Sequence, residues 1–268
     1  MQERNKTKSE SKKNRMAGGK GLTGIQETIL SPRVQRPILL RRKPTLPEEI
    51  PTSIDYRRQE LLFNPPDFQG INVTIVGLGN IGSHTALALA RLGIPGLTLY
   101  DSDIVEKHNL TSQAYEVDDI EQEKVEAITA KIRNINPYCN VSRTCIKLGH
   151  PVTVPCFTTP IVIIAVDSME ERQHLHGWMI RHDIKPELLI DGRVGGNQLE
   201  VYCCHSLDKW KQTFVKHPSP DPCGGRFICY VSLVIAGFIT NSVKRFLKKE
   251  SLVKSVILHM DTLDILKS

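Results

Sequence analysis

The stretch Asn72-Val-Thr-Ile-Val-Gly-Leu-Gly-Asn-Ile-Gly-Ser-His-Thr-Ala-Leu-Ala-Leu-Ala-Arg91 decides the fold of this chain. It opens with an apolar, β-branched run, Val73–Val76, which is typical of a buried parallel strand. Gly77, Gly79 and Gly82 follow in Gly-x-Gly-x-x-Gly spacing, and residues 83–92 are rich in Ala and Leu. In this order the first glycine permits a tight turn and the second lets a nucleotide approach the backbone, while the third lets a helix pack on the strand. The N-terminus of that helix offers free N–H groups to an anion.

Residues 97–101 (Leu-Thr-Leu-Tyr-Asp) predict a second strand, about twenty residues further on, that ends in an acid. A carboxylate at this position is suited to a ribose hydroxyl. The order of strand, glycines, helix and acidic strand end predicts a nucleotide-binding α/β fold. We expect a Rossmann-like, doubly wound and mostly parallel sheet, with antiparallel strands toward the C-terminus.

The rest of the chain continues the alternation of strands and helices. Patterns of apolar residues predict strands over residues 140–148, 160–167, 188–193 and 199–202. Helices are expected over residues 170–181 and 228–248. A further helix is expected to begin at an apparent capping box of Asp119 and Gln122 and to end before Pro137. Residues 104–118 and the Pro- and Gly-containing residues 203–226 are expected to be loops. Cys203, Cys204 and Cys229 are interpreted as structural.

Charge divides the chain unevenly. Of the net charge of +6, residues 1–50 carry +7, so residues 51–268 are close to neutral. We expect residues 1–50 to be a disordered basic tail and linker, and residues 51–268 to form one nucleotide-binding domain. The tail is either a flexible solubilising segment or a contact for nucleic acid, an acidic partner or a membrane surface. Apart from the tail, nucleic acid is not an expected partner.

Cysteine usage and hydropathy favour a cytoplasmic protein. The chain has seven cysteines but no Cys-x-x-Cys pair and no secretory signal, so neither a disulfide framework nor a common structural zinc site is expected. The 17 uncharged residues between Arg226 and Lys244 are too few and too polar for a membrane span. A helix buried in the core or in a dimer interface is the better interpretation.

Four separated segments between residues 55 and 248 together resemble the ThiF/MoeB/HesA family, the ubiquitin-activating-type adenylyltransferases. They are residues 56–59 (Tyr-Arg-Arg-Gln), 99–110, 119–127 and 166–172. The resemblance implies an enzyme that uses ATP and Mg²⁺ to activate the C-terminal carboxylate of a ubiquitin-like or sulfur-carrier protein, typically one that ends in glycine. It also implies a homodimer.

The resemblance assigns roles to individual residues. Arg58 and Lys124 would contact the ATP phosphates, Arg58 often across a dimer interface. Asp103 would hold the ribose with support from Asp101, and Asn109 would hold a phosphate or the adjacent backbone. The nucleotide-binding loop would comprise Gly77, Gly79, Asn80 and Gly82. For these side chains an ordinary surface or strand-end role is the alternative.

The chain departs from the family pattern at two positions. Ser112 stands where the family usually has a phosphate-binding arginine, and Glu121 replaces a customary glycine. Serine supplies no cation at this position, so the expected phosphate contacts are weaker. Arg58 or another arginine could supply the missing positive charge.

Two further residues complete the expected site. Asp167 would coordinate Mg²⁺, because hard carboxylates suit this hard ion, although a helix N-cap is the alternative role. Cys223-Gly-Gly-Arg226 is similar to a Cys-Thr-x-Arg segment in some family members, where the cysteine can accept the activated carbonyl as a thioester. Arg226 would favour the thiolate of Cys223. The alternative is an ordinary loop cysteine.

The resemblance therefore predicts attack of a carboxylate on the α-phosphate of ATP with release of pyrophosphate. No general base is required, because a carboxylate is already ionised at neutral pH. A non-catalytic nucleotide-binding scaffold is the first alternative, favoured by Ser112. An NAD-dependent dehydrogenase is the second.

Overall fold

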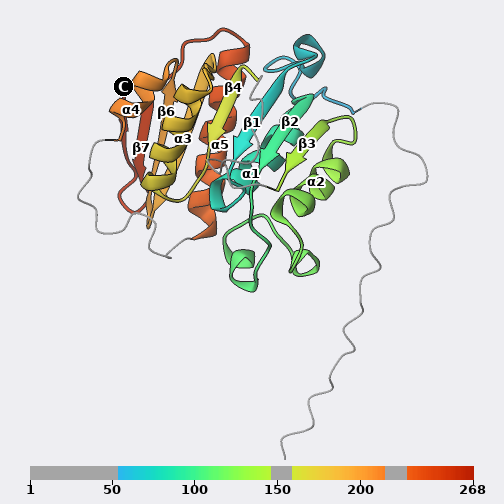
Figure 1. Cartoon of the computed structure of the whole chain (residues 1–268). Helices are drawn as coiled ribbons and strands as arrows, with labels where there is room; N and C mark the ends of the chain where they lie inside the picture. The colour runs from blue at the N-terminus through green and yellow to red at the C-terminus, as the bar shows by residue number, and fades with distance from the viewer. Residues whose placement is uncertain (1–53, 146–158, 215–227) are drawn as a thin grey trace, which may run out of the picture. The chain divides into compact units, whose positions relative to one another are not determined.

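A single eight-stranded sheet forms the centre of the protein. The computed structural model describes residues 54–145, 159–214 and 228–268 (Figure 1). The strand order is β3-β2-β1-β4-β5-β6-β7-β8. Strands β3, β2, β1, β4 and β5 are parallel, and β6, β7 and β8 continue the sheet in antiparallel pairs. The strands are β1 (Asn72–Val76), β2 (Gly96–Tyr100), β3 (Asn140–Thr144), β4 (Ile161–Ile164), β5 (Leu188–Gly195), β6 (Gln198–Cys204), β7 (Ser255–His259) and β8 (Asp264–Lys267). The predicted fold class is confirmed.

Helices cover both faces of the sheet, as the ribbon shows (Figure 1). One face carries α1 (Asn80–Leu92), α2 (Lys124–Ile135) and α5 (Cys229–Leu247), and the larger hydrophobic core lies beneath them. The other face carries α3 (Met169–Arg181) and the short α4 (Leu207–Gln212) over a smaller core that includes Trp178 and Trp210. Short 3₁₀ helices are η1 (Pro65–Phe68), η2 (Lys107–Thr111) and η3 (Val117–Asp119).

The strand order reverses between β1 and β4. The chain moves outward from β1 to β2 and β3, then returns to place β4 on the other side of β1. In open α/β sheets, ligands bind beyond the carboxyl ends of the strands at such a switch point. Here the glycine loop follows β1 and Asp167 follows β4, so the fold brings these two segments to the same edge.

The start of α2 differs from the sequence-based prediction. The helix begins at Lys124 with Glu123 as its N-cap, and the expected capping box of Asp119 and Gln122 is wrong. Asp119 instead accepts the backbone N–H of Glu116 and caps η3. Glu121 between them has a φ of 71°, in the left-handed region that glycine adopts most easily. Glu121, where the family usually has glycine, therefore adopts a conformation that glycine would adopt more easily.

One other expectation is corrected. Residues 203–226 are not all loop, because β6 extends to Cys204 and α4 follows it; Trp210 of α4 is fully buried. Cys203 and Cys204 are buried as expected, whereas Cys229 lies in the predicted helix but is exposed at its first turn, so its structural role stays a prediction.

Helix α5 packs one apolar face against the sheet. Its residues Val231, Ile235, Ile239 and Val243 are fully buried, whereas Leu233 on another face is 57% exposed. Within the described ranges, no helix combines the length and the hydropathy that crossing a bilayer requires. The predicted tail, residues 1–50, lies outside the described residues.

Candidate functional site

The glycine loop after β1 leaves room for a ligand at one glycine only. Gly77 has a φ of 88°, and a Cβ there would lie 2.7 Å from the backbone oxygen of Ala165 beyond β4. A Cβ on Gly82 would lie 1.8 Å from the backbone oxygen of Gly77. A Cβ on Gly79 would meet nothing within 4 Å. Gly77 and Gly82 are thus required by packing, whereas Gly79 borders open space at the N-terminus of α1, where an anion is favoured.

Asp101, at the end of β2, holds the backbone around the glycine loop. Its Oδ2 accepts the backbone N–H of Leu78 at 2.6 Å, and its Oδ1 accepts that of Asp103 at 2.8 Å. Burial raises the pKa of Asp101, and the charge of Lys124 together with these two backbone donors opposes the rise. The carboxylate therefore supports the backbone of the loop, and its predicted part in holding the ribose stays a prediction.

Asp103 and Lys124 form an ion pair at the carboxyl edge of the sheet. Nζ of Lys124 lies 2.8 Å from Oδ2 of Asp103, and the backbone N–H of Lys124 donates to the backbone oxygen of Asp103 at 2.9 Å. Lys124 is the first residue of α2, where its charge opposes the helix dipole. The charge of Lys124 is thus stabilised by the exposed carboxylate of Asp103, whereas the dipole of α2 disfavours it.

Residues 109–115 pack against the first turns of α1. The buried Asn109 accepts the backbone N–H of Glu106 through Oδ1 at 2.8 Å, so its side chain braces its own loop. Ser112 is also buried, and its backbone oxygen lies 3.0 Å from Nε2 of His84 in α1. Tyr115 donates its hydroxyl to the backbone oxygen of Leu78 at 2.8 Å. The loop is well anchored, but its residue 112 contributes no cation.

Two buried amide oxygens lie beside this loop without a partner. Oδ1 of Asn80 and Oε1 of Gln113 have no hydrogen-bond partner among the residues that the structure describes. Asn80 directly follows Gly79, and Gln113 directly follows Ser112, next to the contact between Ala114 and Ser83 of α1. Buried polar atoms without partners are rare and often mark a position for water, an ion or a ligand. These two amides fit a polar ligand at the glycine loop.

Asp167 follows β4 and is exposed at the same edge of the sheet. The N-cap of α3 is Ser168, whose Oγ accepts the backbone N–H of Glu171 at 3.0 Å, so the helix-cap alternative for Asp167 is wrong. One exposed carboxylate beside a phosphate site fits Mg²⁺, which commonly takes one or two carboxylates and completes its shell with phosphate oxygens and water. Within the described parts of the chain, no group of three or more His, Cys, Asp or Glu could hold a metal by itself.

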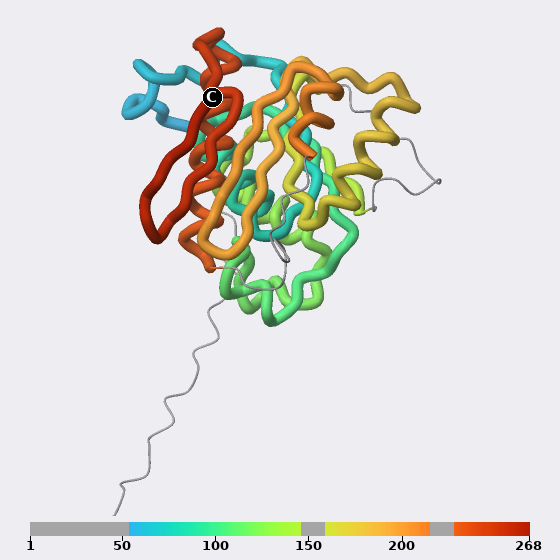
Figure 2. Tube along the Cα trace, turned by 90° about the vertical axis from the view of Figure 1, so that its left-hand side faces the viewer, coloured from blue at the N-terminus to red at the C-terminus, as the bar shows by residue number. Residues whose placement is uncertain are grey.

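One predicted residue, Arg58, is not brought to this edge. Arg58 lies in a turn near the C-terminal end of α1, where Gln59 donates to the backbone oxygen of Leu92 at 2.8 Å. Helix α1 has 13 residues, so its ends are about 20 Å apart. Residues 54–68 and the loop around residues 104–122 lie at opposite ends in both views (Figures 1 and 2). Cys223 lies outside the described residues.

A buried polar network behind the site was not expected from the sequence. Asp191 on β5 is fully buried and contacts Arg172, Arg193 and Trp210. The available signal was an acid placed directly after the apolar run Leu188-Leu-Ile190 in a predicted strand, because a carboxylate in a buried strand requires partners. The sequence alone does not indicate which distant residues supply them.

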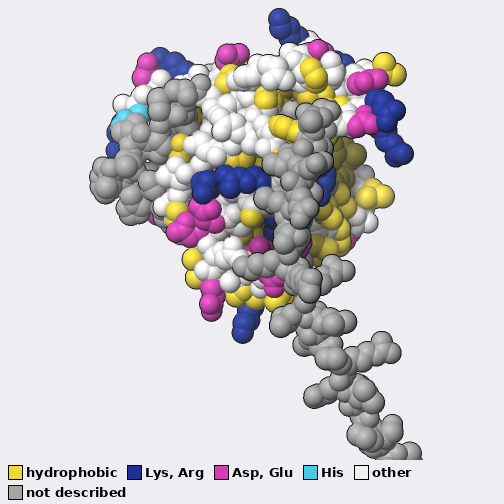
Figure 3. Space-filling model, turned by 90° about the vertical axis from the view of Figure 1, so that its right-hand side faces the viewer, with side chains coloured by type: hydrophobic (Ala, Val, Ile, Leu, Met, Phe, Trp, Pro, Cys, Tyr) yellow, Lys and Arg dark blue, Asp and Glu magenta, His cyan; other side chains and the backbone are white. Residues whose placement is uncertain are grey.

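Charges on the visible side of the molecule are mixed. Figure 3 views the side of β3 and α2, where acidic, basic and apolar side chains are interspersed. No single charge type dominates that side.

Comparison with known proteins agrees with this geometry. The ThiF family profile matches residues 65–257. The tRNA threonylcarbamoyladenosine dehydratase of Escherichia coli is 32% identical over 142 residues, which cover 48% of this chain and 48% of that protein. The molybdopterin-synthase adenylyltransferase of Haemophilus influenzae is 32% identical over 127 residues, 46% of this chain and 49% of that protein. The chain thus spans about half the length of these relatives.

Solved structures show the same fold. The crystal structure of E. coli MccB superposes with a TM-score of 0.63 at 20% identity, covering 81% of this chain and 70% of that one. MccB with ATP superposes with a TM-score of 0.60 at 20% identity, covering 76% and 65%. The match of the family profile to most of the chain, together with the sheet order and the glycine loop, establishes that this protein belongs to the ThiF family.

Proposed function

We propose that this protein is an ATP-dependent adenylyltransferase that activates a carboxylate. The observation that carries the proposal is the open backbone at Gly79, with the Lys124–Asp103 pair at the same edge of the sheet. ATP would lie across the carboxyl ends of β1 and β2, with its phosphates at the N-terminus of α1 and its ribose near Asp103. The names of relatives, which include a molybdopterin-synthase adenylyltransferase and a sulfur carrier protein ThiS adenylyltransferase, support this reaction class.

The chemistry follows from charge and position. A carboxylate oxygen of the acceptor attacks the α-phosphorus of ATP, and the bond to the β-phosphate oxygen breaks to release pyrophosphate. Lys124 neutralises charge that develops on the phosphates, and the N–H groups at the start of α1 hold them in place. Asp167 would hold Mg²⁺, which supplies further neutralisation of the phosphate charge when it is bound.

The acceptor is proposed to be the C-terminal carboxylate of a ubiquitin-like or sulfur-carrier protein, or of a peptide. Relatives named ubiquitin-like modifier-activating enzyme 5 and ThiS adenylyltransferase, and the MccB structure with the peptide MccA, support this class of acceptor. Cys223 is proposed to receive the activated acyl group as a thioester: its thiolate attacks the carbonyl carbon, and AMP leaves with the electron pair.

A homodimer is part of the proposal because the site of one chain lacks the arginine that the family pattern places at residue 112. Ser112 provides no cation, and Arg58 of the same chain lies near the other end of α1. Arg58 of a second copy would supply the missing phosphate contact.

The experiment is ATP–pyrophosphate exchange with Mg²⁺. Candidate acceptors are a carrier protein that ends in Gly-Gly, a short peptide, and tRNA that carries threonylcarbamoyladenosine, the carboxylate-bearing group in the name of one relative. We expect exchange that depends on an acceptor carboxylate and disappears when that carboxylate is amidated. Saturation with ATP at roughly 100 times its dissociation constant should also stabilise the fold by about 2.7 kcal/mol.

Non-catalytic nucleotide binding is the second candidate, and Ser112 is the observation that favours it. Stabilisation by ATP without exchange for any acceptor would support this role. Stabilisation by NAD and not by ATP would contradict the adenylyltransferase proposal.

A further inference from the structure

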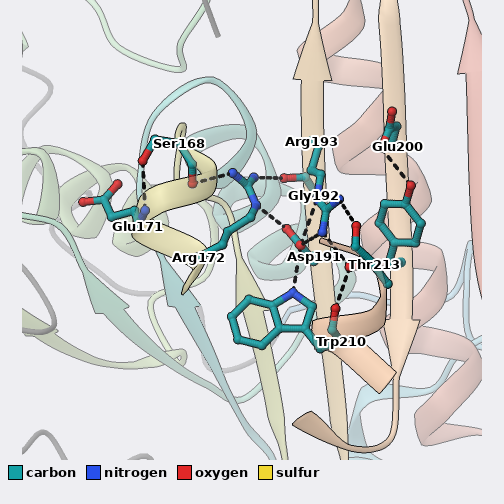
Figure 4. A network of polar contacts seen from close by, with 10 residues as sticks. Ser168, Glu171, Arg172, Asp191, Gly192, Arg193, Glu200, Trp210 and Thr213 are labelled. Atoms are coloured by element: carbon teal, nitrogen blue, oxygen red, sulfur yellow. Dashed lines mark hydrogen bonds and ion pairs between the residues drawn. The ribbon is translucent and has the colours of Figure 1, made fainter. Parts of the chain in front are cut away.

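The carboxylate of Asp191 joins two arginines in the interior of the protein (Figure 4). Its Oδ1 accepts Nε–H of Arg172 at 2.9 Å. Its Oδ2 accepts Nη2–H of Arg193 at 2.6 Å and the indole N–H of Trp210 at 2.8 Å. The side chains of Arg172 and Arg193 are 3% and 11% exposed. Two guanidinium groups on one carboxylate leave a surplus positive charge in the core.

Such a cluster is an expensive way to stabilise a core. Desolvation of buried charges can exceed their mutual attraction, and well-packed apolar residues often stabilise a fold equally well. Rigid, bidentate geometry is what arginine adds that apolar residues lack. The contacts of each arginine beyond Asp191 therefore indicate what the cluster holds in place.

Arg172 connects Asp191 to the turn that carries Asp167. Its Nη1 donates to the backbone oxygen of Ser168 at 3.0 Å, and its Nη2 donates to that of Gly192 at 2.9 Å. The backbone N–H of Arg172 donates to the same oxygen of Ser168 at 3.3 Å. One guanidinium thus ties β5 to the residue next to Asp167, as Figure 4 shows for Ser168.

Arg193 contacts the same carboxylate but a different part of the chain. Its Nη1 donates to the backbone oxygen of Thr213 at 2.9 Å, and its Nη2 donates to Oγ1 of Thr213 at 2.6 Å. Its guanidinium lies 4.6 Å from the ring centre of Tyr202. Arg193 has no hydrogen bond to Ser168 in the described structure, so it is a matched control within the same cluster.

We propose that Arg172, held by Asp191, is a positioning residue that orients the turn bearing Asp167 and thereby sets the affinity of the nucleotide site for its divalent cation. The inference rests on the proposed function. It gives a task to Arg172, the last residue of the family-like segment 166–172. Residues that orient a metal ligand through hydrogen bonds commonly alter metal affinity by about 10- to 100-fold when they are replaced.

The test compares Arg172→Lys with Arg193→Lys. Both variants keep the positive charge and lose guanidinium hydrogen bonds to Asp191, but only the first loses the side-chain contact to Ser168. Binding of Mn²⁺ to protein saturated with a non-hydrolysable ATP analogue is measured by electron paramagnetic resonance, alongside the thermal midpoint. We expect the Mn²⁺ dissociation constant to rise about tenfold or more in Arg172→Lys and to stay within about twofold in Arg193→Lys, although both midpoints fall.

An equal change in Mn²⁺ affinity in the two variants, or no change in either, would overturn the inference and leave the cluster a purely structural one. If Arg172→Lys does not fold, Asp191→Glu is the second variant, because it keeps the charge and shifts the carboxylate that holds Arg172. A raised Mn²⁺ dissociation constant supports the inference, and an unchanged one overturns it. The proposed function is judged separately, by pyrophosphate exchange of the unmodified protein.

Discussion

Nζ of Lys124 lies 2.8 Å from Oδ2 of Asp103, yet the lysine side chain is 7% exposed and the aspartate side chain is 64% exposed. The lysine side chain is therefore almost wholly buried, and its ammonium group meets an exposed carboxylate at the edge of the sheet. Asp103 forms an ion pair with this ammonium group. A bound triphosphate would compete for the same ammonium group.

Lys124→Met should lower pyrophosphate exchange by roughly 10²-fold or more, because it removes a charge aimed at the phosphates. The methionine keeps the buried stem, so the thermal midpoint should change little. Lys131→Met is the control. Lys131 lies on the same helix with its side chain 15% exposed, but it pairs with Glu116 and Asp119. Equal losses of exchange in the two variants would contradict a phosphate role for Lys124.

Gly79→Ala should separate a nucleotide role from a packing role. A Cβ at Gly79 meets nothing within 4 Å, so the variant should fold with little change in its thermal midpoint. It should weaken ATP binding by at least about tenfold, because the methyl group occupies the approach to the backbone. The measurement is the midpoint as a function of ATP concentration.

Gly82→Ala is the contrasting variant. Its Cβ would lie 1.8 Å from the backbone oxygen of Gly77, so we expect loss of folding rather than a selective loss of ATP binding. A Gly79 variant that binds ATP normally would remove the main support for the nucleotide site.

These two glycines also illustrate what the sequence can predict. The spacing of Gly77, Gly79 and Gly82 indicated the loop, because strand, turn and helix are adjacent in the chain. Asp101, Asp103 and Asp167 reach the same edge because they follow strands that the parallel topology aligns. Order along the chain was sufficient for that part of the candidate site.

Features that depend on distant or marginal contacts were not predictable in this way. The partners of Asp191 come from α3, β5 and α4, and nothing in the local pattern pairs them. Helix α4 has six residues and is stabilised by burial of Trp210 rather than by helical periodicity. The capping-box pattern at Asp119 was misleading because a tight turn through Glu121 separates it from α2.

Glu121→Gly tests the strain of that turn. Glu121 is exposed with a φ of 71°, and a left-handed conformation costs a side-chain-bearing residue roughly 1–2 kcal/mol. Glycine removes this cost but loses about 0.5–1 kcal/mol to unfolded-chain entropy. We expect a stabilisation of up to about 1 kcal/mol in chemical denaturation. Asp118→Gly is the control, because Asp118 is not in a left-handed conformation, and it should destabilise the fold. If both variants destabilise the fold equally, the turn is not strained.

The Asp191 cluster should make folding sensitive to acid. Burial by itself would raise the pKa of Asp191, but the charges of Arg172 and Arg193, with hydrogen bonds from Arg193 and Trp210, hold it below its usual value near 3.8. A group with a lowered pKa in the folded state contributes stability above its unfolded pKa, and that stability is lost as the pH falls through the folded pKa.

Arg193→Gln removes one of the two positive charges that lower the pKa of Asp191. The variant should be less stable near neutral pH and lose less free energy of unfolding between about pH 5 and pH 2. Parallel losses in variant and unmodified protein would contradict this assignment.

Mixing two inactive variants tests whether Arg58 acts in a second copy. Arg58 lies in a turn tied to the C-terminal end of α1 through Gln59 and Leu92, so it cannot serve the glycine loop of its own chain. Arg58→Ala and Lys124→Met should each lack exchange. In a mixed dimer, the site of the Arg58→Ala chain keeps its own Lys124 and receives Arg58 from the Lys124→Met chain. Random pairing of equal amounts should therefore restore about a quarter of the sites.

Two copies of a single variant cannot complement each other, so each variant alone is the control. Absence of recovery in mixtures that demonstrably form mixed dimers would show that Arg58 makes no contact with the partner's nucleotide.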